Sequence, residues 1–124
     1  MSVRGLLLVA TSALLTALAN LLLRGGLLQL GQFSLSADKL RPQLLALGSQ
    51  PMFVGGVVLY GLAALVWFSV VSIERLSISY PVLVGLTFIL VTSGAMVFFS
   101  EPLSWQKLSG IAIILTGIVV VARF

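Results

Sequence analysis

Four long apolar runs constrain the fold of this chain more than any other feature. The first covers residues 5–23 and contains no charged side chain. Folded as a helix it would measure about 28 Å, close to the ~30 Å hydrocarbon thickness of a bilayer. The other runs cover residues 52–73, 80–100 and 105–122. The sequence therefore predicts an all-α integral membrane protein with four transmembrane helices in a single membrane domain, residues 1–124.

The composition excludes most enzyme chemistry. Of the 124 residues 60% are hydrophobic and only 8% are charged, far from the usual balance of a soluble protein. Cysteine and histidine are absent, so disulfides, thiolate nucleophiles, imidazole bases and Cys/His metal sites have no residues to form them. The three acids, Asp38, Glu74 and Glu101, lie in separate connecting segments. We expect no enzymatic activity, no cofactor and no metal.

The start of the chain has features of a secretory signal peptide. Arg4 precedes an apolar stretch, and residues 17–19 read Ala-Leu-Ala, like a cleavage site. The apolar run nevertheless continues through residues 21–23 to Arg24, which is long enough to span a membrane. We therefore expect this segment to be a retained transmembrane helix.

The connections between the runs differ in length. Residues 74–79 and 101–104 are so short that the helices on either side are expected to pack as antiparallel hairpins. The first connection, residues 24–51, is longer, and within it Ser36 can cap a short helix that ends at Gly48. This helix either lies in the membrane interface or forms a lid that gathers substrate.

The charges do not select one orientation in the membrane. The net charge is +4, but the basic residues flank apolar runs, as membrane anchors do, and no nucleic-acid partner is expected. One side of the membrane would receive three basic residues, Arg4, Arg75 and Arg123. The other side would receive four, Arg24, Lys39, Arg41 and Lys107. This balance leaves open whether the chain inserts one way only, or both ways and pairs with an inverted copy.

A polar row follows one face of the first run. Ser12, Thr16 and Asn20 recur every four residues and lead to Arg24. The two hydroxyls can bond to carbonyls of their own helix or line a cavity, whereas the Asn20 amide needs partners that one helix cannot wholly supply. Arg24 either anchors the helix at the membrane surface or binds a phosphate through its planar fork.

Aromatic and small residues mark the later runs. Tyr60 and Trp67 share one helix face and serve either packing or ligand contact. Tyr80 is expected at the mouth of the bundle, with Pro81 in the first turn of its helix. Gly110 and Gly117 are one heptad apart, so they favour close approach of another helix, from a second subunit or from the same chain.

The order of these motifs resembles the small multidrug resistance proteins of the EamA-like drug/metabolite transporter superfamily. The resemblance is carried by the Asn20 to Arg24 segment, Ser79-Tyr80-Pro81, Glu101-Pro102-Leu103-Ser104 and the Gly110 to Gly117 spacing, and it covers the chain apart from residues 25–50. Within that superfamily the chain looks most like the small subunits that flip aminoarabinose linked to undecaprenyl phosphate.

One departure separates the chain from the drug exporters of that family. Their first helix carries a glutamate that binds protons or the cationic drug, and the equivalent place here falls near Thr16. A hydroxyl neither exchanges a proton near neutral pH nor balances a buried cation. The resemblance therefore implies the lipid-flippase branch and an anionic lipid-linked sugar as substrate.

The resemblance also implies a site and partners. The expected substrate-binding residues are Thr16, Asn20, Arg24, Trp67 and Tyr80, in the bacterial inner membrane. Two bundles would form a functional dimer, homodimeric or heterodimeric, with an interface that includes Gly110 and Gly117. The alternatives are an exporter of small molecules or cations, and a membrane subunit that does not itself transport.

Overall fold

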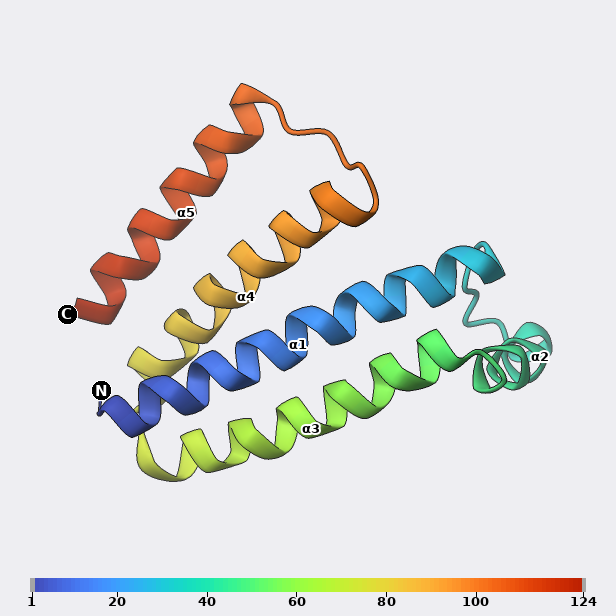
Figure 1. Cartoon of the computed structure of the whole chain (residues 1–124), viewed down its shortest axis with the longest axis horizontal. Helices are drawn as coiled ribbons and strands as arrows, with labels where there is room; N and C mark the ends of the chain where they lie inside the picture. The colour runs from blue at the N-terminus through green and yellow to red at the C-terminus, as the bar shows by residue number, and fades with distance from the viewer. Residues whose placement is uncertain (1, 124) are drawn as a thin grey trace.

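The computed structural model describes residues 2–123 and contains five helices in this part of the chain. They are α1 (Val3–Leu30), α2 (Ala37–Gly48), α3 (Pro51–Ile73), α4 (Leu76–Phe98) and α5 (Trp105–Arg123), shown in Figure 1. Four of them, α1, α3, α4 and α5, are long and apolar enough to cross a membrane. The predicted all-α membrane fold is confirmed.

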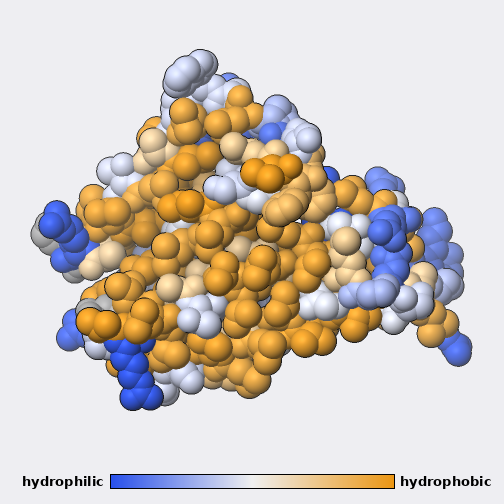
Figure 2. All heavy atoms as spheres, in the orientation of Figure 1, coloured by the Kyte–Doolittle hydropathy of each residue, from blue (hydrophilic) through white to orange (hydrophobic). Residues whose placement is uncertain are grey.

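The outside of the long helices is covered by large apolar side chains. Val97, Phe98 and Ile113 are 72–74% exposed. Figure 2 shows hydrophobic residues over the middle of the visible face and hydrophilic residues gathered toward the ends of the helices. In water each such side chain would be unfavourable by about 25 cal/mol per Å² of apolar surface, a penalty that hydrocarbon removes. The surface is therefore suited to lipid.

Helix α1 lies between α3 and α4 and packs against both (Figure 1). Glu74 and Arg75 alone join α3 to α4, yet these two helices barely touch. The expected hairpin packing is therefore wrong for this pair, whereas α4 and α5 do pack. Six of the seven buried α1 residues are small, which lets α1 enter between its neighbours: Gly5, Ser12, Ala13, Ala17, Ala19 and Gly26.

Two glycines set the close approach of α1 and α3. A Cβ on Gly26 would lie 2.9 Å from the Cβ of Phe53 and 3.1 Å from its backbone nitrogen. A Cβ on Gly56 would lie 3.1 Å from the carbonyl oxygen of Ala19. Contacts to backbone atoms cannot be relieved by rotating a side chain. The helices must therefore move apart if either glycine gains a side chain.

Helix α1 is longer than the predicted span of residues 5–23. It continues to Leu30, so Arg24 lies within the helix and not at its end. Gly25 and Gly26 do not stop it, because Gly26 packs tightly on Phe53. The helix ends at Gly31, whose positive φ of 94° suits glycine and whose N–H donates to the Leu27 carbonyl.

Helix α4 also begins earlier than predicted, at Leu76 and not at residue 80. Pro81 is therefore the sixth residue of the helix, and its expected place in the first turn is wrong. Because proline has no N–H, the Ser77 carbonyl loses its usual helical partner. The Ser79 hydroxyl donates to the Arg75 carbonyl at 2.8 Å and supports the added turn.

The short helix expected within residues 24–51 is present as α2. Leu47 is fully buried against α1 and α3, while Leu44 stays exposed. The Ser36 side chain makes no capping bond, contrary to expectation, and pairs with the Ser34 hydroxyl at 3.0 Å. Gln43 holds the preceding loop instead. Its Oε1 atom accepts a hydrogen bond from the Ser34 backbone N–H at 2.9 Å, and its Nε2 atom donates one to the Ser34 backbone carbonyl at 2.7 Å.

A polar junction joins the start of α1 to the connection between α3 and α4. One oxygen of Glu74 accepts hydrogen bonds from the Ser2 hydroxyl at 2.7 Å and from the Ser2 backbone N–H at 3.1 Å. The hydrogen bond from the Ser2 hydroxyl is the main cause that lowers the pKa of Glu74. The junction therefore fixes the antiparallel register of α1 and α3 at this end.

The contact at Gly26 predicts a specific loss of stability. Gly26→Ala should cost about 1–3 kcal/mol through overpacking, more than the ~1 kcal/mol that alanine gains in helix propensity. Gly61→Ala is the matched control, because a Cβ there meets nothing within 4 Å. Thermal unfolding in detergent micelles should show a lower midpoint for Gly26→Ala only. Equal midpoints would contradict the close packing.

Candidate functional site

Two adjoining cavities lie among α1, α3 and α4. Their volumes are about 240 and 390 Å³. Both are lined by Thr16 from α1, Tyr60 from α3, and Tyr80 and Leu83 from α4. We refer to the two together as the hydroxyl slot, because hydroxyl-bearing side chains from three helices meet there.

The structure brings together three of the five predicted site residues. Thr16, Trp67 and Tyr80 all line the smaller cavity. The rings of Trp67 and Tyr80 meet edge to face, with centroids 5.9 Å apart and planes at 61°. Tyr60 lines both cavities and joins this aromatic wall. Tyr60 and Trp67 thus both line the slot, and contact with a ligand stays a prediction for their shared helix face.

Asn20 and Arg24 are not among the residues that line the slot. The Asn20 side-chain amide donates to the Thr16 carbonyl at 3.0 Å, within its own helix. Arg24 is exposed and follows Thr16 by eight residues, about 12 Å along α1. The polar row therefore runs from the slot toward the other end of α1, and it ends on a guanidinium that forms no ion pair within residues 2–123.

Ser12 has a different role from the expected bond within its helix. Its hydroxyl, which is buried, donates to the Ala63 carbonyl of α3 at 3.0 Å. Thr11, one residue earlier, is exposed and donates to the Leu7 carbonyl of its own helix at 2.8 Å. Ser12 thus links α1 to α3 at the edge of the smaller cavity.

Helix α4 contributes slot residues that the sequence reasoning missed. They follow Tyr80 at steps of three and four, which keeps them on one face of the helix: Leu83, Val84, Thr87, Phe88 and Val91. The signal was present, since Thr87 is seven residues from Tyr80. The spacing alone could not distinguish a cavity-lining face of α4 from an ordinary apolar packing face, because the sequence does not say which face meets the cavity.

The lining of the slot limits its chemistry. None of the residues that line either cavity is charged. Their polar side-chain atoms are hydroxyl groups and, in the smaller cavity, the indole N–H of Trp67. The described chain also holds no group of three or more potential metal ligands. Hydroxyls and aromatic faces suit a neutral polyhydroxyl group such as a sugar.

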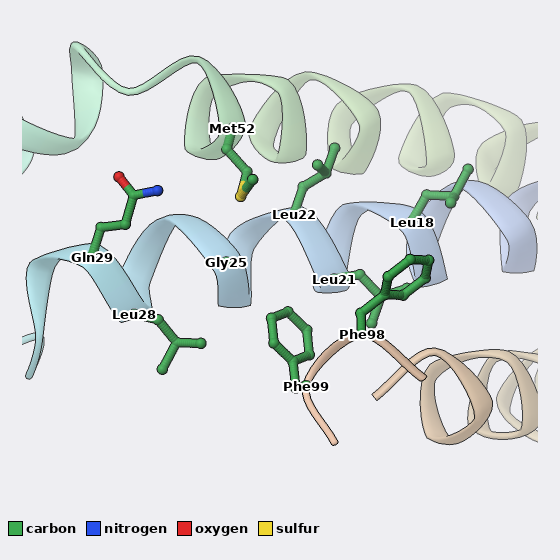
Figure 3. Close-up of a pocket in the computed structure, with 9 residues that line it drawn as sticks. All are labelled: Leu18, Leu21, Leu22, Gly25, Leu28, Gln29, Met52, Phe98 and Phe99. Atoms are coloured by element: carbon green, nitrogen blue, oxygen red, sulfur yellow. The ribbon is translucent and has the colours of Figure 1, made fainter. Parts of the chain in front are cut away.

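A third cavity, of about 440 Å³, lies near the other end of α1 (Figure 3). Helix α1 lines it together with the start of α3 and residues 98 and 99 at the end of α4. Its walls are apolar apart from Gln29, and Figure 3 shows Phe98, Phe99 and leucines of α1 around it. Gln29 is therefore the one polar side chain that this cavity offers to a ligand among the residues that line it.

The bond of Ser12 gives a prediction with a neighbouring control. Ser12→Ala should lower the free energy of unfolding by about 1 kcal/mol, because it leaves the buried helix pair without this link. Thr11→Ala removes an exposed hydroxyl bonded to its own helix and should change stability by less than ~0.5 kcal/mol. Both are measured by thermal unfolding in the same detergent. Reversal of this order would contradict the assigned role.

Comparison with known proteins identifies relatives that cover nearly the whole chain. An uncharacterised protein of Sinorhizobium fredii is 32% identical over 95% of this chain and 94% of its own length. A protein of Shewanella sediminis, named "Probable 4-amino-4-deoxy-L-arabinose-phosphoundecaprenol flippase subunit ArnF", is 34% identical over 98% of this chain and 89% of its own. The corresponding subunit ArnE of Erwinia tasmaniensis is 34% identical over 90% and 96%.

No family model matches the chain, and no solved structure matches it significantly. The four apolar helices and the bacterial relatives together make it a multi-pass protein of the bacterial inner membrane. At this identity and coverage, the chain belongs to the family of the 4-amino-4-deoxy-L-arabinose-phosphoundecaprenol flippase subunits.

Proposed function

We propose that this chain is one subunit of a flippase that moves a polyprenyl-phosphate-linked sugar across the membrane. The observation that carries the proposal is the hydroxyl slot, an uncharged and partly open cavity between apolar helices, in which hydroxyl groups interrupt a mostly apolar lining. The named relatives, which are flippase subunits for an aminoarabinose lipid, support the same reading.

The physical task is to carry sugar hydroxyls through hydrocarbon. A hydroxyl moved into an apolar medium without a hydrogen bond costs roughly 2–7 kcal/mol, so a sugar cannot cross unaided at a useful rate. Thr16, Tyr60 and Tyr80 offer replacement partners at the slot. The polyprenyl chain stays in lipid and needs no site. Only the headgroup is taken out of water.

The phosphate is assigned to Arg24. Its guanidinium is exposed and belongs to no ion pair among residues 2–123, which leaves its five donors available. Asn20 lies one turn away on the same row, between Arg24 and the slot. A planar fork binds phosphate through two hydrogen bonds. This arrangement would hold the phosphate toward the membrane surface while the sugar enters the slot.

A cation exporter is the weaker candidate. A lipophilic cation in a low-dielectric cavity needs an opposite charge, and the slot has none to offer in this chain. The absence of an acid among the lining residues therefore favours a substrate part without positive charge at this position.

We also assign the pairing of subunits to α5. This helix packs on α4 alone and has no buried residue in the described chain. A Cβ on Gly110 or Gly117 would meet nothing of the chain within 4 Å. The glycine face is thus not used for packing within the subunit, and it is open to a second copy or to a similar subunit.

The phosphate assignment predicts the behaviour of Arg24 variants. Arg24→Ala should weaken binding of a polyprenyl-phosphate sugar at least about tenfold, because hydrogen bonds to charged groups contribute ~1.5–3 kcal/mol. Arg24→Lys should be intermediate, since an ammonium lacks the planar fork. Binding and transbilayer movement are measured with purified protein in liposomes that contain the lipid.

Arg123→Ala serves as the control, because Arg123 is an exposed base at the end of α5. It should bind as the unaltered protein does. Failure of the unaltered protein, alone and with a similar subunit, to move the lipid would refute the flippase proposal. Uptake of a lipophilic cation driven by a pH gradient would favour the exporter instead.

The assignment of α5 predicts an effect on oligomeric state. Gly117→Leu and Gly110→Leu place branched side chains on the open face and should shift dimers toward monomers in native mass spectrometry from lipid nanodiscs. Val119→Leu is the control, because Val119 lies on a different face of α5 and is already exposed. An unchanged dimer fraction in both glycine variants would exclude this interface.

A further inference from the structure

Thr87 has a polar atom without a partner at the centre of the bundle. Its Oγ1 atom is buried and makes no hydrogen bond in the part of the chain that the structure describes. Buried hydroxyls are normally paired, since an unpaired one costs free energy. The side chain lines the larger cavity of the hydroxyl slot, beside Tyr80 and Thr16.

Other helical hydroxyls in this chain show what Thr87 could have done. Four of them donate to the carbonyl four residues earlier, at 2.7–2.8 Å: Thr11, Ser79, Ser109 and Thr116. The equivalent acceptor for Thr87 is the Leu83 carbonyl, and Thr87 does not use it. The hydroxyl therefore keeps its hydrogen-bonding capacity although a local partner exists.

Thr87 lies at the middle of its membrane-spanning helix, where an unpaired hydroxyl could bind a substrate. It is the twelfth of the 23 residues of α4, and Thr16 is the fourteenth of the 28 residues of α1. Both threonines thus lie halfway along their helices, where a bilayer offers no water. Tyr80 lies two turns from Thr87 on the same helix face, about 10.5 Å nearer the membrane surface.

We propose that Thr87 is a substrate-binding residue, which hydrogen-bonds a hydroxyl of the sugar headgroup at the middle of the membrane, opposite Thr16. This inference rests on the flippase function proposed above and adds a specificity-determining residue to it. Rotation about the Cα–Cβ bond moves the threonine hydroxyl from one staggered position to another, so the donor can turn into the cavity without movement of the backbone.

The positions of the four residues along the helices give each of them a separate role in this proposal. Arg24 would hold the phosphate toward one end of the bundle, and Tyr80 would meet the headgroup toward the opposite end. Thr87 and Thr16 would replace water at the step where the sugar is farthest from both surfaces. The sugar hydroxyls would then satisfy the Thr87 oxygen, which lacks a partner in the empty protein.

The test uses Thr87→Val, which keeps the shape of the side chain and removes the hydroxyl. Because the hydroxyl has no partner in the empty protein, the variant should unfold at the same temperature as the unaltered chain or higher. Its affinity for a short-chain polyprenyl phosphate carrying an uncharged pentose, such as L-arabinose, should fall about fivefold. Affinity for the same polyprenyl phosphate without sugar should not change.

Two further variants act as controls. Thr87→Ser restores the hydroxyl and should bind within twofold of the unaltered chain. Thr116→Val removes a hydroxyl outside the slot, bonded to the Ala112 carbonyl, and should bind both lipids normally. Affinities are measured as ligand-induced shifts in thermal unfolding in detergent, over a range of lipid concentrations.

The outcomes separate this inference from the function on which it rests. If the unaltered chain binds the sugar lipid but Thr87→Val binds it equally well, the role of Thr87 is refuted and the flippase proposal stands. A lower unfolding temperature for empty Thr87→Val would also overturn the role, since it would reveal a structural bond. If the unaltered chain binds neither lipid, both proposals fail.

Discussion

Hydrocarbon supplies no hydrogen bonds, and this constraint governs the arrangement of every polar group in the bundle. Ser12 satisfies its hydroxyl on the Ala63 carbonyl across the α1–α3 contact. That bond requires the two backbones to lie close, which the small side chains at Gly26 and Gly56 permit. The central position of α1 between α3 and α4 therefore depends on where its residues are small.

In the slot the same constraint is left unmet. The hydroxyl of Thr87 has no partner within residues 2–123, although the lipid around the bundle cannot provide one. A structure that leaves such a group unpaired at mid-membrane gains less stability than it could, and a polyhydroxyl ligand would recover the difference. The residues that line the slot carry no charge, which suits the uncharged hydroxyl groups of the proposed sugar.

Helix α5 is the part of the described chain that the proposed second subunit would cover. It packs on α4 alone and presents Gly110 and Gly117 outward, so it adds little to the packing of its own subunit. The relatives are themselves named as subunits. The cavities of the slot are bounded by α1, α3 and α4, so α5 is free of that role in the described chain.

The sequence by itself determined the membrane class, the number of long apolar helices and the polar row from Ser12 to Arg24, because these follow from local hydropathy and helical periodicity. It also indicated the family through the order of short motifs. It could not determine that Arg24 lies within a longer helix, since Gly25 and Gly26 resemble a stop when their packing partner is unknown.

Only the tertiary structure decided which faces meet. It brought Thr16, Trp67 and Tyr80 to one cavity, left Asn20 outside its lining, and added Thr87 from α4. It also separated α3 from α4 despite their two-residue connection. The physical reason is that nearly every face of these helices is apolar, so periodicity cannot tell lipid from protein contact, and close packing of small residues makes the choice.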